Sequence, residues 1–235
     1  MNEPRTIQLL RTEPHDCSYL KGAIATTEFV SPEENIGIQT YQAINDAGFR
    51  RSGAHFYRPS CGSCTECKAL RVQVESFAPT KSQKRILRKN SDLEIRITSS
   101  PDADGYFELY QEYIQERHQD GDMYPPDREQ FDNFICTPKD WTRFIEFYTD
   151  ELVMVAVCDF LPRGLSAIYS FFDPKHSGKS LGSYAILAQI DIANKLELPF
   201  LYLGYWIEES EKMNYKNRYN PCEILENKDW RSLPF

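Results

Sequence analysis

Residues 141–172 read WTRFIEFYTDELVMVAVCDFLPRGLSAIYSFF, and this stretch decides the fold. It contains three apolar runs, Trp141 to Tyr148, Leu152 to Phe160 and Leu165 to Phe172, which are rich in aromatic and branched side chains. Thr149-Asp150 lies between the first two runs, and Pro162-Arg163-Gly164 lies between the last two. Apolar runs of this length joined by such short turns predict an antiparallel meander of three strands.

After the meander, the apolar residues change from the period of a strand to the period of a helix. Ile186, Leu187, Ile190 and Leu196 mark the apolar face of this helix, and Ser180 to Ser183 form its entry loop. Phe200 to Trp206 predicts a further strand, which follows the helix closely.

Before the meander, alternating apolar residues predict two strands, at Leu70 to Val74 and at Leu93 to Ile97. Helical spacing predicts two helices that follow them, at Tyr106 to Ile114 and at Asp127 to Ile135. The order of elements around the meander is therefore helices, three antiparallel strands, a helix and a strand.

Two more helices are predicted in the N-terminal half. Ser31-Pro32-Glu33-Glu34 has the pattern of a helix start, with Ser31 as the cap, and Gly48 ends this helix. A second helix lies between the two early strands, and its basic residues share one face because they recur at spacings of three and four. These basic residues are Lys81, Lys84, Arg85 and Arg88.

The element order resembles the GNAT acyltransferase fold, in which the loop amides and the helix N-terminus hold phosphates or an acyl donor. We therefore expect an α+β protein with a GNAT-like domain over residues 101–235. Residues 1–100 would form a smaller α+β part that contains the clustered cysteines. The loop Gly178 to Ser183 lacks the glycine pattern of the coenzyme A users, which leaves room for a different donor.

Charge is distributed unevenly along the chain. The 235 residues carry a net charge of −8, which by itself argues against a nucleic-acid partner. Between Arg50 and Arg96, however, 11 Lys and Arg stand against 4 Asp and Glu, so this segment carries +7. A basic segment in an acidic protein indicates one confined anionic partner, or else a solvated basic face.

The chain has no apolar window long enough for a membrane span, and Met1 to Leu10 lacks the apolar stretch of a secretory signal. Its seven cysteines are then better interpreted as reduced thiols or metal ligands than as disulfides. We expect a cytoplasmic protein without a membrane partner.

Two motifs point to a known family. The first is 56-FYRPSC-61 with Cys64 and Cys67, followed by Leu70-Arg71 and 81-KSQKR-85. The second is 202-YLGYWI-207, then 212-KMNYK-216, Pro221 and Glu223. Together with Cys17 and Tyr19, they resemble the bacterial aspartate/glutamate leucyltransferases, relatives of the eukaryotic arginyl-tRNA-protein transferases, over nearly the whole chain.

The resemblance implies a reaction in which the α-amine of a protein that begins with Asp or Glu attacks the ester carbonyl of leucyl-tRNA. Attachment of leucine would mark such a protein for degradation by the N-degron pathway. The pKa of an α-amine is ordinarily about 7.7 to 8.0, so the amine must lose a proton before it attacks. Catalysis can rest on holding the amine and the activated ester in register, with donors for the oxyanion.

By the same resemblance, Tyr205 and Tyr215 are candidate catalytic residues, and Tyr205 and Trp206 would face the terminal adenosine. Gly204 would let the backbone approach the donor. The full set expected to bind aminoacyl-tRNA is Gly182, Ser183, Tyr184, Gly204 and Trp206, with Lys81, Lys84, Arg85 and Arg88 of the basic helix. The base remains open between Tyr215, Glu223 and a substrate-assisted route through the ribose hydroxyl.

Selecting an acidic N-terminal residue requires a fixed cation, because a desolvated carboxylate is tolerated only when it is paired. Arg71, Lys212 and Lys216 are the candidates, and Lys216 is preferred because the resemblance is densest around it.

The cysteines form a separate candidate site. Cys61, Cys64 and Cys67 recur at intervals of three residues, and Cys17 could supply the fourth thiol that a tetrahedral zinc or an iron–sulfur cluster needs. The arginyl relatives are associated with an iron–sulfur cluster in this region. Buried structural thiols are the alternative, and no cofactor is required by the reaction itself.

Other interpretations remain open. A coenzyme A-dependent N-acetyltransferase would explain the GNAT-like order, and a non-enzymatic zinc-type nucleic-acid module would explain the cysteines and the basic helix. Within the family, leucine belongs to the bacterial branch and arginine to its relatives, so the amino acid transferred is not fixed. Neither is the oligomeric state.

Overall fold

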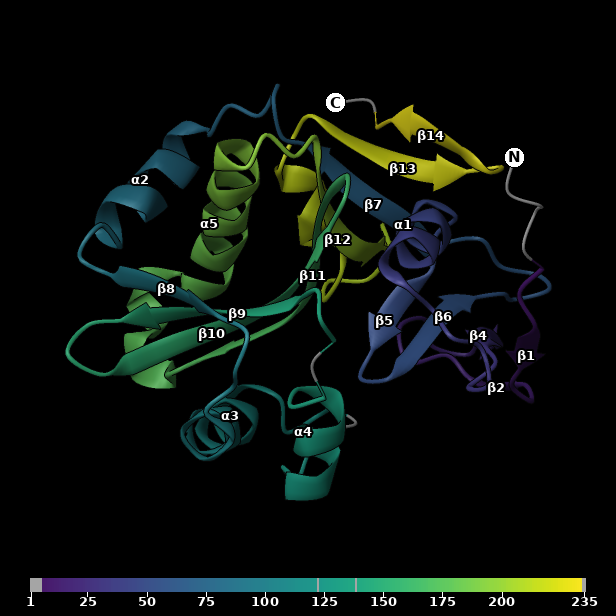
Figure 1. Ribbon diagram of the computed structural model, residues 1–235, viewed down its shortest axis with the longest axis horizontal. Helices are drawn as coiled ribbons and strands as arrows, with labels where there is room; N and C mark the ends of the chain where they lie inside the picture. Colours follow the sequence, from purple (N-terminus) through teal and green to yellow (C-terminus); the bar gives the residue numbers. More distant parts are fainter. Residues whose placement is uncertain (1–5, 122, 138, 234–235) are drawn as a thin grey trace.

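A large sheet forms the centre of the computed structural model, which describes residues 6–121, 123–137 and 139–233. Its strands are β7 (Lys68–Gln73), β8 (Glu94–Thr98), β9 (Thr142–Tyr148), β10 (Leu152–Leu161), β11 (Gly164–Phe172), β12 (Phe200–Trp206), β13 (Cys222–Glu226) and β14 (Asp229–Ser232). They lie in the order β14-β13-β7-β12-β11-β10-β9-β8 (Figure 1).

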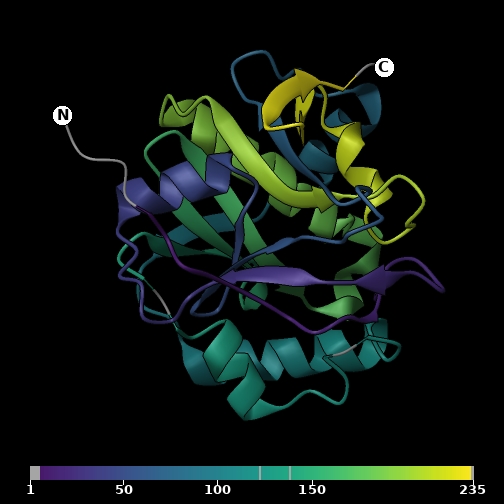
Figure 2. The same ribbon diagram turned by 90° about the vertical axis from the view of Figure 1, so that its right-hand side faces the viewer.

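The predicted meander is confirmed, since β9, β10 and β11 pair as antiparallel neighbours. Val155 at the centre of β10 stands opposite Glu146 on one side and Phe171 on the other. β10 is buried along most of its length because helices cover both faces of the sheet. Helices α3 (Ala103–Arg117) and α4 (Arg128–Phe134) lie on one side, and α5 (Leu181–Lys195) lies on the other (Figures 1 and 2).

A smaller sheet is built from the N-terminal part of the chain. Its strands are β1 (Leu9–Arg11), β4 (Thr27–Val30), β6 (His55–Pro59) and β5 (Arg50–Ser52), in that spatial order, beside a short pair of β2 (His15–Asp16) and β3 (Ile24–Ala25). Helix α1 (Ile38–Asp46) packs beside this sheet, where Tyr41, Phe49 and Phe56 share a core with Leu161 of β10. The two sheets therefore meet through apolar side chains.

The large sheet takes strands from both sides of residue 100. β7 and β8 precede that position, and β7 pairs with β12 and β13. The division into residues 1–100 and 101–235 stays a prediction, and hydrogen bonds within the large sheet join the two ranges.

The predicted start of the first helix at Ser31 is wrong. Ser31 instead donates its backbone N–H to the Gln8 carbonyl at 2.9 Å and opens a turn that Glu34 closes. Pairing between strands thus removes Ser31 from the helix, and α1 begins only after Gly37. Its end agrees with the prediction, because Gly48 has a φ of +91°, a conformation that favours glycine.

The basic helix is confirmed as α2 (Lys81–Lys89). Thr80 caps its first turn, and the Gln83 side chain bonds back to the Thr80 N–H at 2.8 Å, so both halves of a capping box are present.

The protein combines helices with one large sheet that is antiparallel except between β11 and β12, which confirms the predicted mixing of α and β structure. None of the helices in the described ranges is long and apolar enough to cross a membrane.

Candidate active site

The second family motif lies where β12 leaves its neighbour β11. The two strands pair in parallel only from Gly164 to Ser166, opposite Phe200 to Tyr202. Beyond that point Gly204 has a φ of +75°, and the pairing of β12 with β7 shifts register. A glycine is required here because other residues are strained at this φ. After the bulge, the Trp206 side chain and the Tyr205 carbonyl face the short helix η2 (Asn214–Arg218), whereas the Tyr205 ring packs against Tyr57 of β6.

Lys216 of η2 is turned inward toward this bulge. Its amine donates to the Tyr205 carbonyl at 2.7 Å, and Lys216 is only 8% exposed. It forms no ion pair with a carboxylate among the described residues. Burial, followed by the positive charge of Arg50, lowers the pKa of Lys216 to about 7.

Arg50 of β5 lies on the other side of Tyr205 and was not among the predicted site residues. It is 3% exposed, and its guanidinium carbon stands 5.5 Å from the Tyr202 ring and 5.8 Å from the Tyr205 ring. Its Nη1 donates to the Asn45 carbonyl at 3.0 Å, to Asn45 Oδ1 at 3.1 Å and to the Phe49 carbonyl at 2.6 Å.

The remaining donors of this group have no partner. Arg50 Nε and Nη2 and Asn45 Nδ2 are all buried without a hydrogen bond in the part of the chain that the structure describes. A sequence signal did exist. Arg50 and Arg51 are consecutive in a strand, so their side chains point to opposite faces and at least one had to turn inward.

Of the two predicted catalytic tyrosines, Tyr205 is buried and Tyr215 is partly buried. The Tyr205 hydroxyl donates to the Gly48 carbonyl at 2.8 Å, and burial raises its pKa well above the ordinary value. Trp206 is 6% exposed and donates its indole N–H to the Asn214 carbonyl at 3.0 Å. Burial also raises the pKa of Tyr215. Tyr205 and Trp206 therefore stack on no open surface in this conformation, and their roles toward the terminal adenosine stay predictions.

Arg71 and Lys212 have carboxylate partners of their own. Arg71 Nε lies 2.7 Å from Glu223, and its guanidinium lies between the rings of Phe200 and Trp230, at 3.7 and 4.1 Å. Lys212 pairs with Asp120 at 2.6 Å, where both side chains are exposed. Of the three cations predicted to hold an acidic residue, the structure brings only Lys216 to the end of β12.

The first turn of α5 is a second feature near the same end of the sheet. Ser180 precedes it in the left-handed conformation, at φ 56°, after the short helix η1 (Pro174–Lys179). Gly182 and Ser183 are partly exposed. Tyr184 is buried against Phe147, with ring centroids 5.6 Å apart, so only its backbone is suited to the predicted role.

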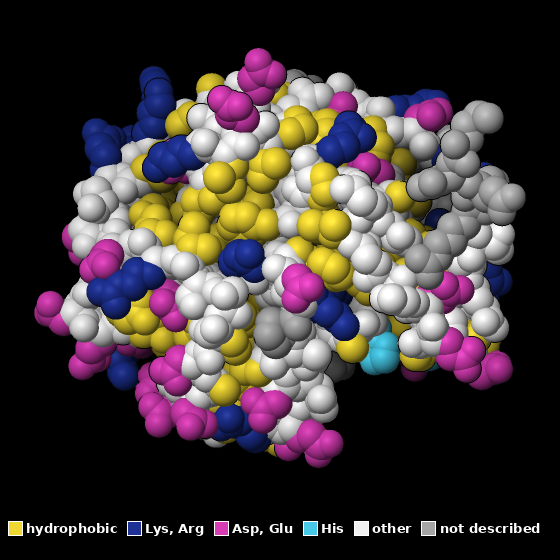
Figure 3. All heavy atoms as spheres, viewed as in Figure 1, with side chains coloured by type: hydrophobic (Ala, Val, Ile, Leu, Met, Phe, Trp, Pro, Cys, Tyr) yellow, Lys and Arg dark blue, Asp and Glu magenta, His cyan; other side chains and the backbone are white. Residues whose placement is uncertain are grey.

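Helix α2 lies beside both of these elements. Gln83 donates to the Arg218 carbonyl of η2 at 3.0 Å, and Asn90 donates to the Lys179 carbonyl before α5 at 2.9 Å. Lys and Arg side chains gather over α2 at the upper left of Figure 3. All four predicted cations of this helix are exposed, namely Lys81, Lys84, Arg85 and Arg88.

The four cysteines of the candidate metal site lie near one another. Burial raises the pKa of the Cys67 thiol to about 12, and the neighbouring Cys17, Cys61 and Cys64 add to this rise. Even so, the described residues contain no group of three or more His, Cys, Asp or Glu side chains placed to hold a metal ion. Metal binding stays a prediction. Cys158 and Cys222 are buried in the core, and Cys136 is partly buried.

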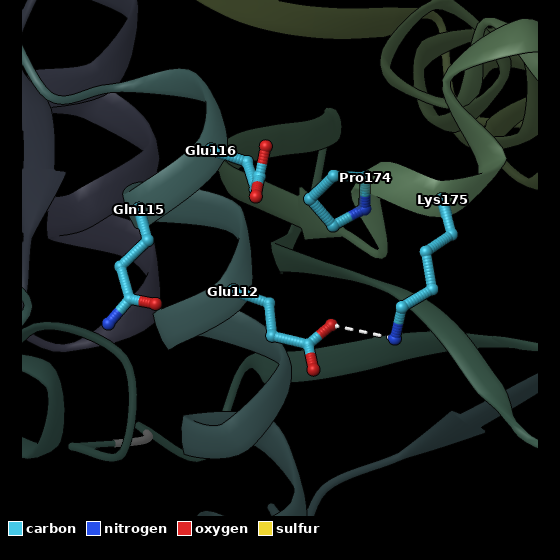
Figure 4. A pocket seen from close by; sticks show the side chains of 5 residues that line it. All are labelled: Glu112, Gln115, Glu116, Pro174 and Lys175. Atoms are coloured by element: carbon cyan, nitrogen blue, oxygen red, sulfur yellow. Dashed lines mark hydrogen bonds and ion pairs between the residues drawn. The ribbon is translucent and has the colours of Figure 1, made fainter.

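A separate hollow lies between α3 and η1, away from these motifs. Figure 4 shows Glu112 and Lys175 facing each other across it, and their ion pair measures 3.3 Å. Both side chains are exposed, and no predicted site residue lines the hollow.

Comparisons with known proteins fit this arrangement. Residues 15–85 match the family model "Arginine-tRNA-protein transferase, N terminus", and residues 105–226 match the model of the C terminus of the same family. The chain belongs to the arginine-tRNA-protein transferase family. Membership confirms the predicted enzyme class, an aminoacyltransferase that uses aminoacyl-tRNA.

Curated members of the family are similar over their full length. Proteins named aspartate/glutamate leucyltransferase are 47% identical in Pseudomonas savastanoi pv. phaseolicola, with 99% of this chain and 100% of that protein covered, and 48% identical in Marinobacter nauticus, with 99% of both covered. Among solved structures, L-PGS from Bacillus licheniformis has a TM-score of 0.46 and 9% identity over 72% of this chain and 50% of that one.

Proposed function

We propose that this protein transfers leucine from leucyl-tRNA to the α-amine of proteins that begin with Asp or Glu. The names of the full-length relatives support the two substrates. The structural observation that carries the proposal is the amine of Lys216, which is buried at the end of β12 without a carboxylate partner among the described residues. Its lowered pKa leaves this amine only partly protonated at neutral pH, and an incoming carboxylate would favour its charged form.

The donor would lie against α2, η2 and the first turn of α5. The exposed cations of α2 suit the phosphates of a tRNA, because an RNA backbone needs charge without burial. The partly exposed N-terminus of α5, at Gly182 and Ser183, suits the aminoacyl ester, because helix N-terminal amides favour developing negative charge. In this proposal the β9 to β12 region acts as a GNAT-like transfer domain.

The acceptor would enter beside Tyr205. Its amine attacks the ester carbonyl, a C–N bond forms, the C–O bond to the ribose breaks, and the ribose oxygen takes a proton as it leaves. Holding both reactants in register supplies much of the rate, because the ester is already activated.

Neither side-chain candidate for the base is favoured by its surroundings. Glu223 accepts hydrogen bonds from Arg71 at 2.7 Å and from Gln73 at 2.9 Å, which hold it as a structural carboxylate. The raised pKa of Tyr215 keeps its hydroxyl protonated. We therefore favour a substrate-assisted proton transfer through the ribose hydroxyl, with no cofactor required. Leucylated acceptors would then enter N-degron degradation.

The test uses purified protein with separate pools of leucyl-tRNA and arginyl-tRNA, each offered with peptides that start in Asp, Glu, Lys or Arg. We expect a product that is heavier by one leucine residue with Asp and Glu peptides only. Transfer of arginine would move the protein to the other branch of the family. Turnover of acyl-coenzyme A, or tRNA binding without any transfer, would instead favour the acetyltransferase or the nucleic-acid module.

A further inference from the structure

The three buried donors around Arg50 call for a physical explanation. Arg50 Nε and Nη2 and Asn45 Nδ2 find no acceptor among the described residues, and a buried donor without a partner is unfavourable. The charge of Arg50 increases this free-energy cost, because a guanidinium removed from water needs an anion nearby.

Other buried arginines of this protein do have such an anion. Arg51 is 4% exposed and pairs with Asp159, while Arg71 is 7% exposed and pairs with Glu223. Arg50 is 3% exposed and forms no ion pair with a described residue. The charged group that Arg50 does influence is Lys216, a second cation, because the positive charge of Arg50 helps to lower the pKa of Lys216.

The unpaired edge of the Arg50 guanidinium has a fixed orientation. Nη1 is committed to Asn45 and Phe49, which fixes the guanidinium plane and leaves the edge formed by Nε and Nη2 free. That edge presents two parallel N–H donors, the arrangement that binds both oxygens of one carboxylate. Asn45 Nδ2 adds a third donor beside it.

We infer that the Nε and Nη2 edge of Arg50 binds the side-chain carboxylate of the acceptor's N-terminal Asp or Glu, with Lys216 as the second cation, an inference that rests on the proposed function. Arg50 is thus a specificity-determining residue. A small enclosed group of donors suits a single carboxylate, whereas the open cations of α2 suit the extended phosphates of RNA. Because Arg50 is enclosed here, the surrounding side chains must move aside to admit the carboxylate.

The test compares Asp-initiated with Asn-initiated peptides, which differ in charge and hardly in shape. Affinity is measured for each peptide without tRNA, and kcat/KM is measured with leucyl-tRNA. We expect the wild type to prefer Asp, and Arg50→Gln to weaken Asp binding roughly 10- to 100-fold while Asn binding changes little, because a charge-assisted bidentate contact is lost. Arg128→Gln, at an exposed arginine of α4 that pairs with Asp104 and Asp132, is the matched control.

A second variant protects the test against simple misfolding. Asn45→Asp keeps the size of the side chain and its bond to Arg50 Nη1, but it places a carboxylate beside the guanidinium. If Arg50 were only structural, this change would leave activity intact, since it supplies the missing anion. If Arg50 binds the acceptor, the new carboxylate competes, and the preference for Asp over Asn collapses in a folded protein.

The outcomes separate the two proposals. A wild type that transfers leucine to no peptide overturns the proposed function. A wild type that leucylates Asp peptides, with variants that keep its preference for Asp over Asn, overturns the role of Arg50 alone. Variants that lose leucyl-tRNA binding but keep peptide binding would assign the Arg50 edge to the tRNA instead, and would likewise overturn the inference.

Discussion

Arg51 and Asp159 form a bidentate ion pair across the boundary between the two sheets. Arg51 Nε lies 2.6 Å from Asp159 Oδ2, and Arg51 Nη2 lies 2.8 Å from Oδ1. Both side chains are almost fully buried, and Tyr41 and Thr142 donate to the same carboxylate at 2.9 and 2.7 Å. This network fixes the smaller sheet, and hence Arg50 beside Arg51, against the large one.

Breaking this pair on one side should destabilise the whole protein. Arg51→Met leaves the Asp159 carboxylate buried without its cation, and we expect a loss of about 3 to 5 kcal/mol in the free energy of unfolding. Arg51→Met combined with Asp159→Leu should recover much of the loss, because neither charge remains. Urea unfolding of the single and double variants measures both effects, and equal losses in the two would contradict the assignment.

Arg71 should contribute to stability and not to acceptor choice. Its charge is balanced by Glu223, and its guanidinium packs between Phe200 and Trp230. We expect Arg71→Gln to lower the unfolding free energy by about 1 to 3 kcal/mol through the unpaired carboxylate and the lost stacking. The ratio of kcat/KM for Asp and Asn peptides should not change. A collapsed ratio with normal stability would return Arg71 to the acceptor site.

Lys216 should contribute to transfer activity more than to stability. Lys216→Met retains the length of the side chain and removes the buried amine, so transfer to Asp peptides should slow by about 10-fold or more without comparable loss of stability. Equal losses of activity and of unfolding free energy would show a structural role.

The lowered pKa of Lys216 also predicts how stability depends on pH. Between about pH 7 and the ordinary pKa of lysine, the unfolded chain binds a proton that the folded protein does not. The free energy of unfolding therefore rises with pH over this range. Relative to Lys216→Met, the wild type should gain about 1.4 kcal/mol per pH unit from about pH 7.5 to 9.5. A difference that is independent of pH would mean that the buried amine stays charged.

How far the sequence predicts this structure depends on the range of the interactions involved. The meander and the basic helix follow from local pattern, because alternation and a capping box act within a few residues. The start at Ser31 fails because pairing with Gln8, distant in the chain, uses the same residues for a strand end. Local preference is overridden there by tertiary contact.

The candidate site divides in the same way. The motif around Lys216 points to that residue, whereas only the partners Glu223 and Asp120 distinguish it from Arg71 and Lys212. Arg50 escapes prediction because nothing in a sequence tells which of two consecutive arginines receives a carboxylate. That distinction rests on Asp159, more than one hundred residues away.

The exposed cations of α2 should control the salt dependence of tRNA binding. An acidic chain of net charge −8 repels RNA over most of its surface, so binding must rest on local positive charge. Each Lys or Arg that contacts a phosphate steepens the fall of log K with log salt by about 1. We expect Lys84→Gln with Arg88→Gln to weaken leucyl-tRNA binding and to reduce this slope by about 2, with peptide affinity unchanged.

Filter binding at several salt concentrations measures the slope, and Arg128→Gln should leave it as in the wild type. A slope that stays the same in the α2 variant would make this face a solvated surface and would move the tRNA elsewhere.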